Sequence, residues 1–218
     1  MTSQGSEQIA VQALEVGAAS YVPKRTLNQD LLDTVQRVLD VSVRERGHQR
    51  FLQCMTHNEC QFELESDISL IPLLVSYLRD AVAPLELCGE TERIRLAIAL
   101  EEALNNALYH GNLEIGSELR EKDSDAYYAL IEQRKQESPY RDRHIFVHAK
   151  FSRAQAEFTI RDEGPGFHPH KLPDPTAPAN LEQVSGRGVL LMRTFMDEVL
   201  YTDQGNQVTL VKQRSSRS

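Results

Sequence analysis

The residues with the clearest chemical potential are an acid and an amide spaced four apart, Glu102 and Asn106. Around them, apolar residues recur at helical spacing over 96–112, which predicts a helix with one buried face. Residues four apart stack on one side of a helix, so both polar side chains are expected at the edge of that face. Desolvation there is costly, and a solvated flank is the alternative interpretation. Gly111, after the last periodic residue, predicts a left-handed helix C-cap.

Two further segments combine glycines with a charged side chain. The first follows a predicted strand and the second precedes a predicted helix. The residues they offer are Asp162, Gly164 and Gly166 in the first segment and Gly186, Arg187 and Gly188 in the second. Free amides and the helix dipole attract phosphate at a helix N-terminus. Taken alone, the first segment is equally well explained as a plain strand-to-loop turn and the second as a loop with a solvated arginine.

Together, in this order, the three pieces resemble the N, G1 and G2 boxes of the GHKL ATPase superfamily, which includes gyrase and the histidine kinases. The nucleotide site of that superfamily is the Bergerat fold. The phrases EALNNALYHGN, IRDEGPGF, SGRGVLLMRTFMDEV and NQVTLVK resemble, within it, the anti-sigma-factor serine/threonine kinases. The resemblance covers most of the chain, from Phe51 to Arg214.

This resemblance implies a role in Mg²⁺-ATP binding for each residue. It assigns nucleotide binding to Asn106, Asp162, Gly164, Gly166, Gly186, Arg187 and Gly188. Asp162 would accept a hydrogen bond from the exocyclic amine of adenine, and Asn106 would offer its amide oxygen to Mg²⁺, which prefers oxygen ligands. Glu102 would be the general base that orients or deprotonates the attacking hydroxyl or water.

Two details of the match bear on these assignments. Glu101 and Asn105 form a competing acid–amide pair, and Glu102 and Asn106 are preferred because they fit the register of the family better. In many relatives a threonine follows the glycine before the last strand and helps to hold the adenine-binding aspartate. Asn206 stands at that position here, and its amide is expected to serve instead.

Composition limits the classes of partner and compartment. The chain has 218 residues, 40% of them hydrophobic and 26% charged, as expected for a soluble globular protein. Its net charge of −8 argues against nucleic acid or anionic lipid as the main partner. No apolar run approaches a membrane span, and no secretory signal is visible. The three cysteines lack C-x-x-C spacing, which fits a reducing compartment, so a cytoplasmic location is expected.

Residues 1–50 are expected to form a first unit, too short to bury a core alone. Periodicity predicts a helix that ends at Gly17, a short strand over 19–22 and a second helix, with 44–50 as a linker or a continuation of that helix. This unit is expected to pack beside the second unit or to mediate a homodimer through its Leu31–Val43 helix.

The same unit resembles the last third of a bacterial response-regulator receiver domain. Thr2 matches the switch hydroxyl, and Lys24 matches the lysine that pairs with the phosphoryl group, although Pro23-Lys24 replaces the usual Lys-Pro. The acidic pocket and phospho-acceptor of a receiver would precede Met1. Met1 is therefore expected to be an internal methionine of a longer protein, and the unit is not expected to be phosphorylated in the receiver manner.

Residues 51–214 are expected to form the ATPase domain, and 215–218 a disordered tail. The predicted fold is a two-layer α/β sandwich in which helices cover one face of a mixed, mostly antiparallel sheet. Alternating apolar and polar residues predict strands at 62–65, 145–151 and 156–162 and a terminal hairpin of 198–202 with 207–212. The polar stretch 115–143 is expected to be a helical surface excursion that ends near Ser138-Pro139.

The leading functional hypothesis is an Mg²⁺-ATP-dependent protein serine/threonine kinase of the anti-sigma type. It would bind ATP under a lid over His168–Val184 and pass the γ-phosphoryl group to a small antagonist (anti-anti-sigma, STAS-like) protein, with a sigma factor as a further partner. One alternative is an ATP-gated protein-binding module without significant phosphotransfer. Another is the catalytic half of a histidine kinase, which is disfavoured because no histidine-bearing dimerisation hairpin precedes the domain.

Overall fold

The computed structural model describes residues 5–116, 119, 122–169 and 187–215. The chain divides into two compact units, Met1–Cys54 and Met55–Ser218. Each unit is described by itself below.

The regular elements of the first unit, within its described residues, are all helical. It consists of α1 (Gly5–Glu15), the 3-10 turn η1 (Lys24–Thr26) and α2 (Leu27–Gln53), which runs through the segment 44–50. The strand predicted over 19–22 is wrong: Gly17 turns the chain at φ +103°, and the described part of this unit holds no second strand with which that segment could pair. Although α2 has 27 residues, neither it nor any other described helix is long and apolar enough to cross a membrane.

The second unit is built on a five-stranded sheet. Its strands are β1 (His57–Glu65), β2 (His144–Ser152), β3 (Gln155–Arg161), β4 (Glu198–Tyr201) and β5 (Gln207–Gln213). They lie in the order β1-β2-β3-β5-β4, and every neighbouring pair is antiparallel. Its helices are α3 (Leu70–Val82), η2 (Ala83–Leu85), α4 (Glu90–Asn105), η3 (Asn106–Asn112), α6 (Ser124–Arg134), η4 (Tyr140–Asp142) and α7 (Arg187–Phe195).

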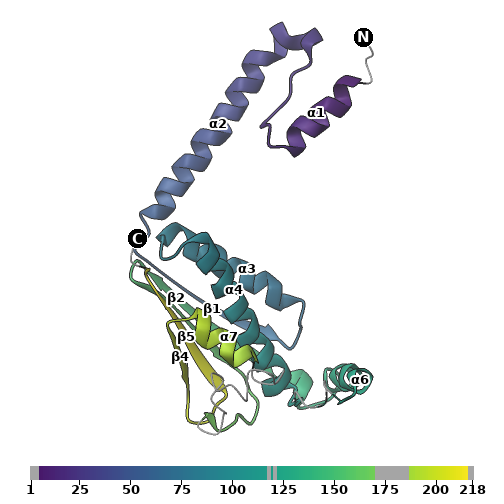
Figure 1. Cartoon of the computed structure of the whole chain (residues 1–218), viewed down its shortest axis with the longest axis vertical. Helices are drawn as coiled ribbons and strands as arrows, with labels where there is room; N and C mark the ends of the chain where they lie inside the picture. The colour runs from purple at the N-terminus through teal and green to yellow at the C-terminus, as the bar shows by residue number, and fades with distance from the viewer. Residues whose placement is uncertain (1–4, 117–118, 120–121, 170–186, 216–218) are drawn as a thin grey trace. The chain divides into compact units, whose positions relative to one another are not determined.

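Helices α3, α4 and α7 cover one face of this sheet (Figure 1). The strands alternate as the sequence predicts, so that in β2 Ile145, Val147 and Phe151 are buried towards the helices. On α4, residues such as Leu96 and Leu100 are fully buried against them, and each such side chain contributes roughly 1.5–3 kcal/mol of hydrophobic stabilisation. The predicted two-layer α/β sandwich is confirmed, with an entirely antiparallel sheet.

The polar stretch before β2 packs onto the end of the central helix. Tyr127 and Ile131 of α6 are buried, and the ring centroid of Tyr127 lies 6.2 Å from that of Tyr109 on η3. Two arginines stack on the Tyr140 ring of η4, with guanidinium carbons 4.7 Å (Arg134) and 5.2 Å (Arg143) from its centroid. The excursion is therefore anchored beside η3.

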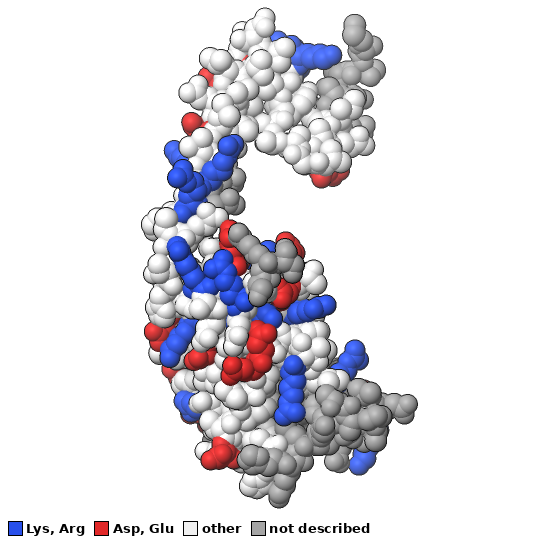
Figure 2. Space-filling model, turned by 60° about the vertical axis from the view of Figure 1, so that its left-hand side comes forward, with Lys and Arg blue, Asp and Glu red and all other residues white. Residues whose placement is uncertain are grey.

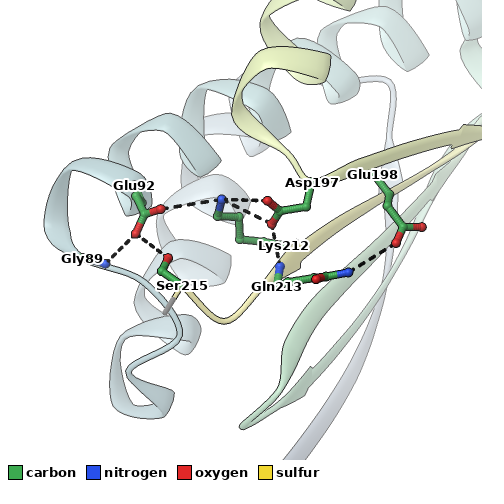
Figure 3. Close-up of polar contacts among 7 residues, drawn as sticks. All are labelled: Gly89, Glu92, Asp197, Glu198, Lys212, Gln213 and Ser215. Atoms are coloured by element: carbon green, nitrogen blue, oxygen red, sulfur yellow. Dashed lines mark hydrogen bonds and ion pairs between the residues drawn. The ribbon is translucent and has the colours of Figure 1, made fainter. Parts of the chain in front are cut away.

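A charged seam closes the opposite end of the helical layer (Figure 3). The Nζ of Lys212 lies 3.8 Å from Glu92 Oε1 and 3.3 Å from Asp197 Oδ2. Glu92 Oε2 accepts hydrogen bonds from the Gly89 amide, at 3.1 Å, and from the Ser215 hydroxyl, at 2.7 Å. The seam joins the start of α4, the α7–β4 turn and the end of β5. A disordered tail was predicted from residue 215, but Ser215 is held here, and 216–218 lie outside the described residues.

Candidate functional site

The acid and the amide of the central helix lie beside the first turn of α7. A Cβ atom built on Gly188 would stand 2.6 Å from Glu102 Oε2 and 3.7 Å from Asn106 Nδ2. A real Cβ does not approach another atom as closely as 2.6 Å, so the Glu102 carboxylate can keep this position only beside a glycine. Glu102 and Asn106 are half-buried, whereas Glu101 is exposed. The two motifs, 82 positions apart in the chain, therefore meet in one place.

Asn106 is also the residue at which the central helix changes its winding. From Asn106 to Asn112 the chain forms a π-helix, η3, in direct continuation of α4. Its wider hydrogen bonding appears at its end, where the Leu113 amide donates to the Leu108 carbonyl at 2.9 Å, five residues back. Single π-helical turns are frequent at functional sites. Here the turn joins Asn106, at its start, to Gly111 and Asn112, at its end.

Asp162 lies against the end of this π-helix. A Cβ on Gly111 would stand 2.3 Å from Asp162 Cγ, and a Cβ on Gly164 would stand 2.3 Å from the Gly111 carbonyl oxygen. The predicted left-handed cap at Gly111 is wrong, because Gly111 is an interior residue of η3 without a positive φ. Glycine is required at 111 for a different reason: the Asp162 carboxylate occupies the space of its side chain. Asp162 is 8% exposed.

Burial governs the ionisation of Asp162. Loss of solvent raises the pKa of Asp162 to about 6, against the lowering effects of the Gly164 amide and of the guanidinium groups of Arg143 and Arg161. The Gly164 amide donates to Asp162 Oδ1 at 2.8 Å. At neutral pH the group is a mostly ionised, buried acceptor, which suits a ligand that brings an N–H donor.

The loop after β3 packs on the β4–β5 turn through two glycines with positive φ. Gly166 has φ +76° and Gly205 has φ +78°, and a Cβ on either would come within 2.1 Å of a carbonyl oxygen of the other segment. The Asp162 amide donates to the Asn206 carbonyl at 3.0 Å, and Asn206 Nδ2 donates to the Asp162 carbonyl at 3.2 Å. Asn206, which replaces the threonine of many relatives, thus holds the backbone of Asp162.

The remaining predicted residues are only partly covered by the structure. Arg187 is exposed at the start of α7, while Gly186 and residues 170–184 of the predicted lid lie outside the described residues. His110 Nδ1 lies 2.6 Å from the Ile115 carbonyl oxygen. Within the described ranges, no group of three or more His, Cys, Asp or Glu side chains is placed to hold a metal ion.

Sequence reasoning missed Asn112, the last residue of η3. Asn112 is fully buried and bonds to Ser66, Arg143 and Glu163, which lie 46, 31 and 51 residues away along the chain. An asparagine after His110-Gly111 is the only local signal, and it does not predict burial. These partners come together only through the β1–α3 and η4–β2 connections, which no local pattern specifies.

An acid and an amide face a glycine at a helix start in this one-sided α/β sandwich, and a buried aspartate lies among glycines at a strand end. This arrangement is compatible with a nucleotide-binding domain. A model of the histidine kinase-like ATPase domain matches residues 64–212, more than half of the chain. The chain therefore belongs to the histidine kinase-like ATPase domain family, within the GHKL superfamily. A search of curated proteins gave no significant match.

Proposed function

We propose that the second unit binds Mg²⁺-ATP between η3, the start of α7 and the loop after β3, and transfers the γ-phosphoryl group to a serine or threonine hydroxyl of a partner protein. The observation that carries the proposal is the approach of Gly188 to Glu102 and Asn106. It brings an acid and an amide to the start of a helix, where phosphates bind well. Membership of the ATPase family supports ATP as the ligand.

The two ends of η3 would contact different parts of the nucleotide, the adenine at one end and the phosphates at the other. Asp162, beside Gly111, accepts a hydrogen bond from the adenine amine. Asn106 begins η3 five residues earlier and offers an amide oxygen, a ligand type that suits Mg²⁺ when phosphate oxygens and water complete the shell. When bound, Mg²⁺ would neutralise charge on the phosphate oxygens. Arg187 and the amides at the start of α7 would hold the same phosphates.

Glu102 is proposed to act on the attacking group. Its carboxylate accepts the hydroxyl proton while the hydroxyl oxygen forms a bond to the γ-phosphorus. The bond between that phosphorus and the bridging oxygen of the β-phosphate breaks, and ADP leaves. Of the two acid–amide pairs on α4 and the start of η3, only the atoms of Glu102 and Asn106 are among the three nearest neighbours of a Gly188 Cβ, which supports this pair.

The partner and the regulatory input rest on the resemblance of the sequence. The proposed substrate is a small STAS-like antagonist protein of the anti-anti-sigma type, and a sigma factor is the proposed second partner. The first unit, as a receiver remnant, would link phosphorelay input to this output in the bacterial cytoplasm. Residues 51–214 would be the domain that carries the site.

Titration and phosphotransfer assays on two single variants test this function. Asn106→Ala should abolish Mg²⁺-ATP binding in isothermal titration calorimetry, because the metal loses its protein ligand. Glu102→Ala should bind ATP normally and transfer its phosphoryl group to candidate antagonist proteins at least about 100-fold more slowly. Glu101→Ala, which removes the exposed neighbouring acid, is the control and should behave as the wild type.

Each alternative function has its own outcome in these assays. Unchanged affinity in Asn106→Ala would show that the metal assignment is wrong, and normal transfer by Glu102→Ala would remove Glu102 from the base role. Tight ATP binding by the wild type without transfer to any partner would favour the nucleotide-gated binding module. An acid-labile product phosphorylated on histidine would favour a histidine-kinase catalytic domain.

A further inference from the structure

We propose that Asn112 is a positioning residue for Asp162: its buried amide fastens the loop 162–166 to the end of η3 and so sets the direction of the Asp162 carboxylate. This inference rests on the proposed function, because it takes Asp162 as the group that selects adenine. It adds a residue that touches neither the nucleotide nor the reacting atoms.

The contacts of Asn112 are those of a buried clamp. Asn112 is 0% exposed. Its Oδ1 accepts from the Glu163 amide at 2.9 Å, and its Nδ2 donates to Ser66 Oγ at 3.2 Å. Its backbone carbonyl accepts from Arg143 Nη1 at 2.8 Å, and Ser66 Oγ donates to the Arg143 carbonyl at 3.1 Å. Asn112, Ser66 and Arg143 thus form a closed ring of hydrogen bonds that meets the loop at Glu163.

Three consecutive backbone amides hold the loop, and each of them donates a hydrogen bond to a different partner. The Asp162 amide donates to Asn206 in the β4–β5 turn, and the Gly164 amide donates to the Asp162 carboxylate itself. The Glu163 amide, between them, donates to Asn112. Of these three bonds, the one to Asn112 alone joins the loop to η3. Without it, Asp162 keeps its tie to the sheet but loses its fixed place beside Gly111.

Two further contacts support the ring formed by Asn112, Ser66 and Arg143 and the loop that it holds. Arg143, with a side chain that is 16% exposed, forms an ion pair with Glu114 at 2.8 Å. Glu163 Oε2 accepts from the His144 amide at 2.8 Å, at the start of β2. A paired, nearly buried arginine holds its geometry better than an exposed one. Asn112 therefore has a rigid support from which to orient the loop.

The preference for adenine over another base distinguishes a residue that positions Asp162 from a residue that only stabilises the fold. Inosine triphosphate carries an oxygen where adenine carries its amine, so it presents an acceptor to Asp162 at that position instead of the amine donor. Competition against a fluorescent ATP analogue should give the wild type at least about a tenfold preference for ATP over inosine triphosphate. Asn112→Ala should lower that ratio to below about threefold, by weakening ATP while leaving inosine triphosphate nearly unchanged. In hydrogen exchange without nucleotide, the Glu163 amide should lose protection in this variant.

Thr159→Val is the matched control, because it removes the hydrogen bond between Thr159 and Thr209 Oγ1, at 3.2 Å, from the same sheet without touching the loop. It should keep the full ratio. A folded Asn112→Ala protein that keeps the ratio, or that weakens both nucleotides equally, would overturn the inference while leaving the proposed function intact. A wild type that binds neither nucleotide would instead contradict the proposed function, and unchanged Glu163 protection would overturn the clamp independently. Asn112→Ser carries the same expectations if the alanine variant does not fold.

Discussion

At the scale of single residues, Asp162 combines a structural cost with a proposed function. Its carboxylate is buried, which raises its pKa to about 6, and it is surrounded by backbone of η3 and of its own loop. Burying a charge that is not needed for folding is unfavourable. A protein with an acid here gains a strong acceptor between two glycines, which suits recognition of an amine.

The pH dependence of stability tests that cost. The folded-state pKa of Asp162 lies above the ordinary value of 3.8, so the group contributes no penalty below about pH 4 and lowers the free energy of unfolding progressively as pH rises through 6. At most about 3 kcal/mol is lost in this way. Asp162→Asn should therefore gain stability relative to the wild type between pH 4 and pH 7.5 in urea titrations. Its affinity for ATP should fall at least about tenfold, because an amide presents a donor to the adenine amine.

Asp203→Asn removes one exposed acid from the same end of the sheet and serves as the control for net charge. It should follow the wild type in both measurements. A stability difference between Asp162→Asn and the wild type that does not change with pH would contradict the assignment of a buried, titrating carboxylate.

Individual residues were predictable where their chemistry is local. Asn106 and the glycines around Asp162 and Gly188 stand out in the sequence because asparagine and glycine are unfavourable inside helices and strands, and Glu102 stands out by its spacing from Asn106. The reason why position 111 requires glycine could not be predicted from the sequence. Gly111 follows a periodic apolar stretch, as a helix cap would, and the carboxylate that excludes a side chain from it comes from a strand 51 positions later.

At the scale of elements, the important relation is that between α4 and the start of α7. The atom that a Cβ on Gly188 would meet is Glu102 Oε2, the far end of a flexible side chain, not the backbone. Gly188→Ala should therefore fold, with stability unchanged or raised by up to about 1 kcal/mol through its better helix propensity. The displaced Glu102 carboxylate should lower phosphotransfer at least about tenfold. Thermal unfolding and the transfer assay measure the two effects.

Gly89→Ala is the matched control for this change, because a Cβ there meets nothing within 4 Å. Gly164→Ala marks the other extreme, since its Cβ would stand 2.3 Å from a backbone carbonyl oxygen that cannot turn aside, and it should unfold at a clearly lower temperature. Undiminished transfer by Gly188→Ala would argue against a working role for the contact with Glu102.

The elements themselves were largely predictable, because apolar periodicity specifies strands and helices that have a partner face. The four strands β2, β3, β4 and β5 lie within a few residues of their predicted bounds. The segment 19–22 has an apolar composition suited to a strand, but a strand forms only beside another, and the described part of the first unit offers none. The π-helix η3 was not predictable, because its winding depends on packing around Gly111 and Asn112 rather than on local propensity.

At the scale of the whole molecule, the first unit leaves an unusual amount of apolar surface uncovered. On α2, Leu32 is 76% exposed, Leu39 54% and Val43 65%, and these residues recur seven and four apart along one side of the helix. A helix with such a stripe gains stability by packing against another apolar surface. Helix α2 by itself therefore supplies an apolar contact surface.

The charges of α2 identify a second copy of the same helix as the expected occupant of that stripe. Its first half carries Asp30, Asp33 and Asp40 with one base, Arg37, and its second half carries Arg44, Arg46 and Arg50 with one acid, Glu45. Figure 2 shows the basic side chains gathered along the later part of α2. Two copies that pair antiparallel place the acidic half of each against the basic half of the other in a two-fold symmetric interface. A parallel pair would place like charges together.

We therefore expect a dimer that weakens as salt rises from about 50 to about 500 mM, because screening removes the attraction between opposite halves. Sedimentation analysis should show Leu32→Lys/Leu39→Lys as a monomer at both salt concentrations. Leu73→Lys, which changes a similarly exposed leucine (68%) on α3, should remain dimeric.

A dimer that strengthens with salt would indicate parallel pairing. A wild type that stays monomeric at high protein concentration would show that the stripe is not a surface for self-association. Phosphotransfer by the monomeric variant then decides whether pairing matters to the site, because every residue proposed to bind the nucleotide or to act on it belongs to the second unit of a single chain.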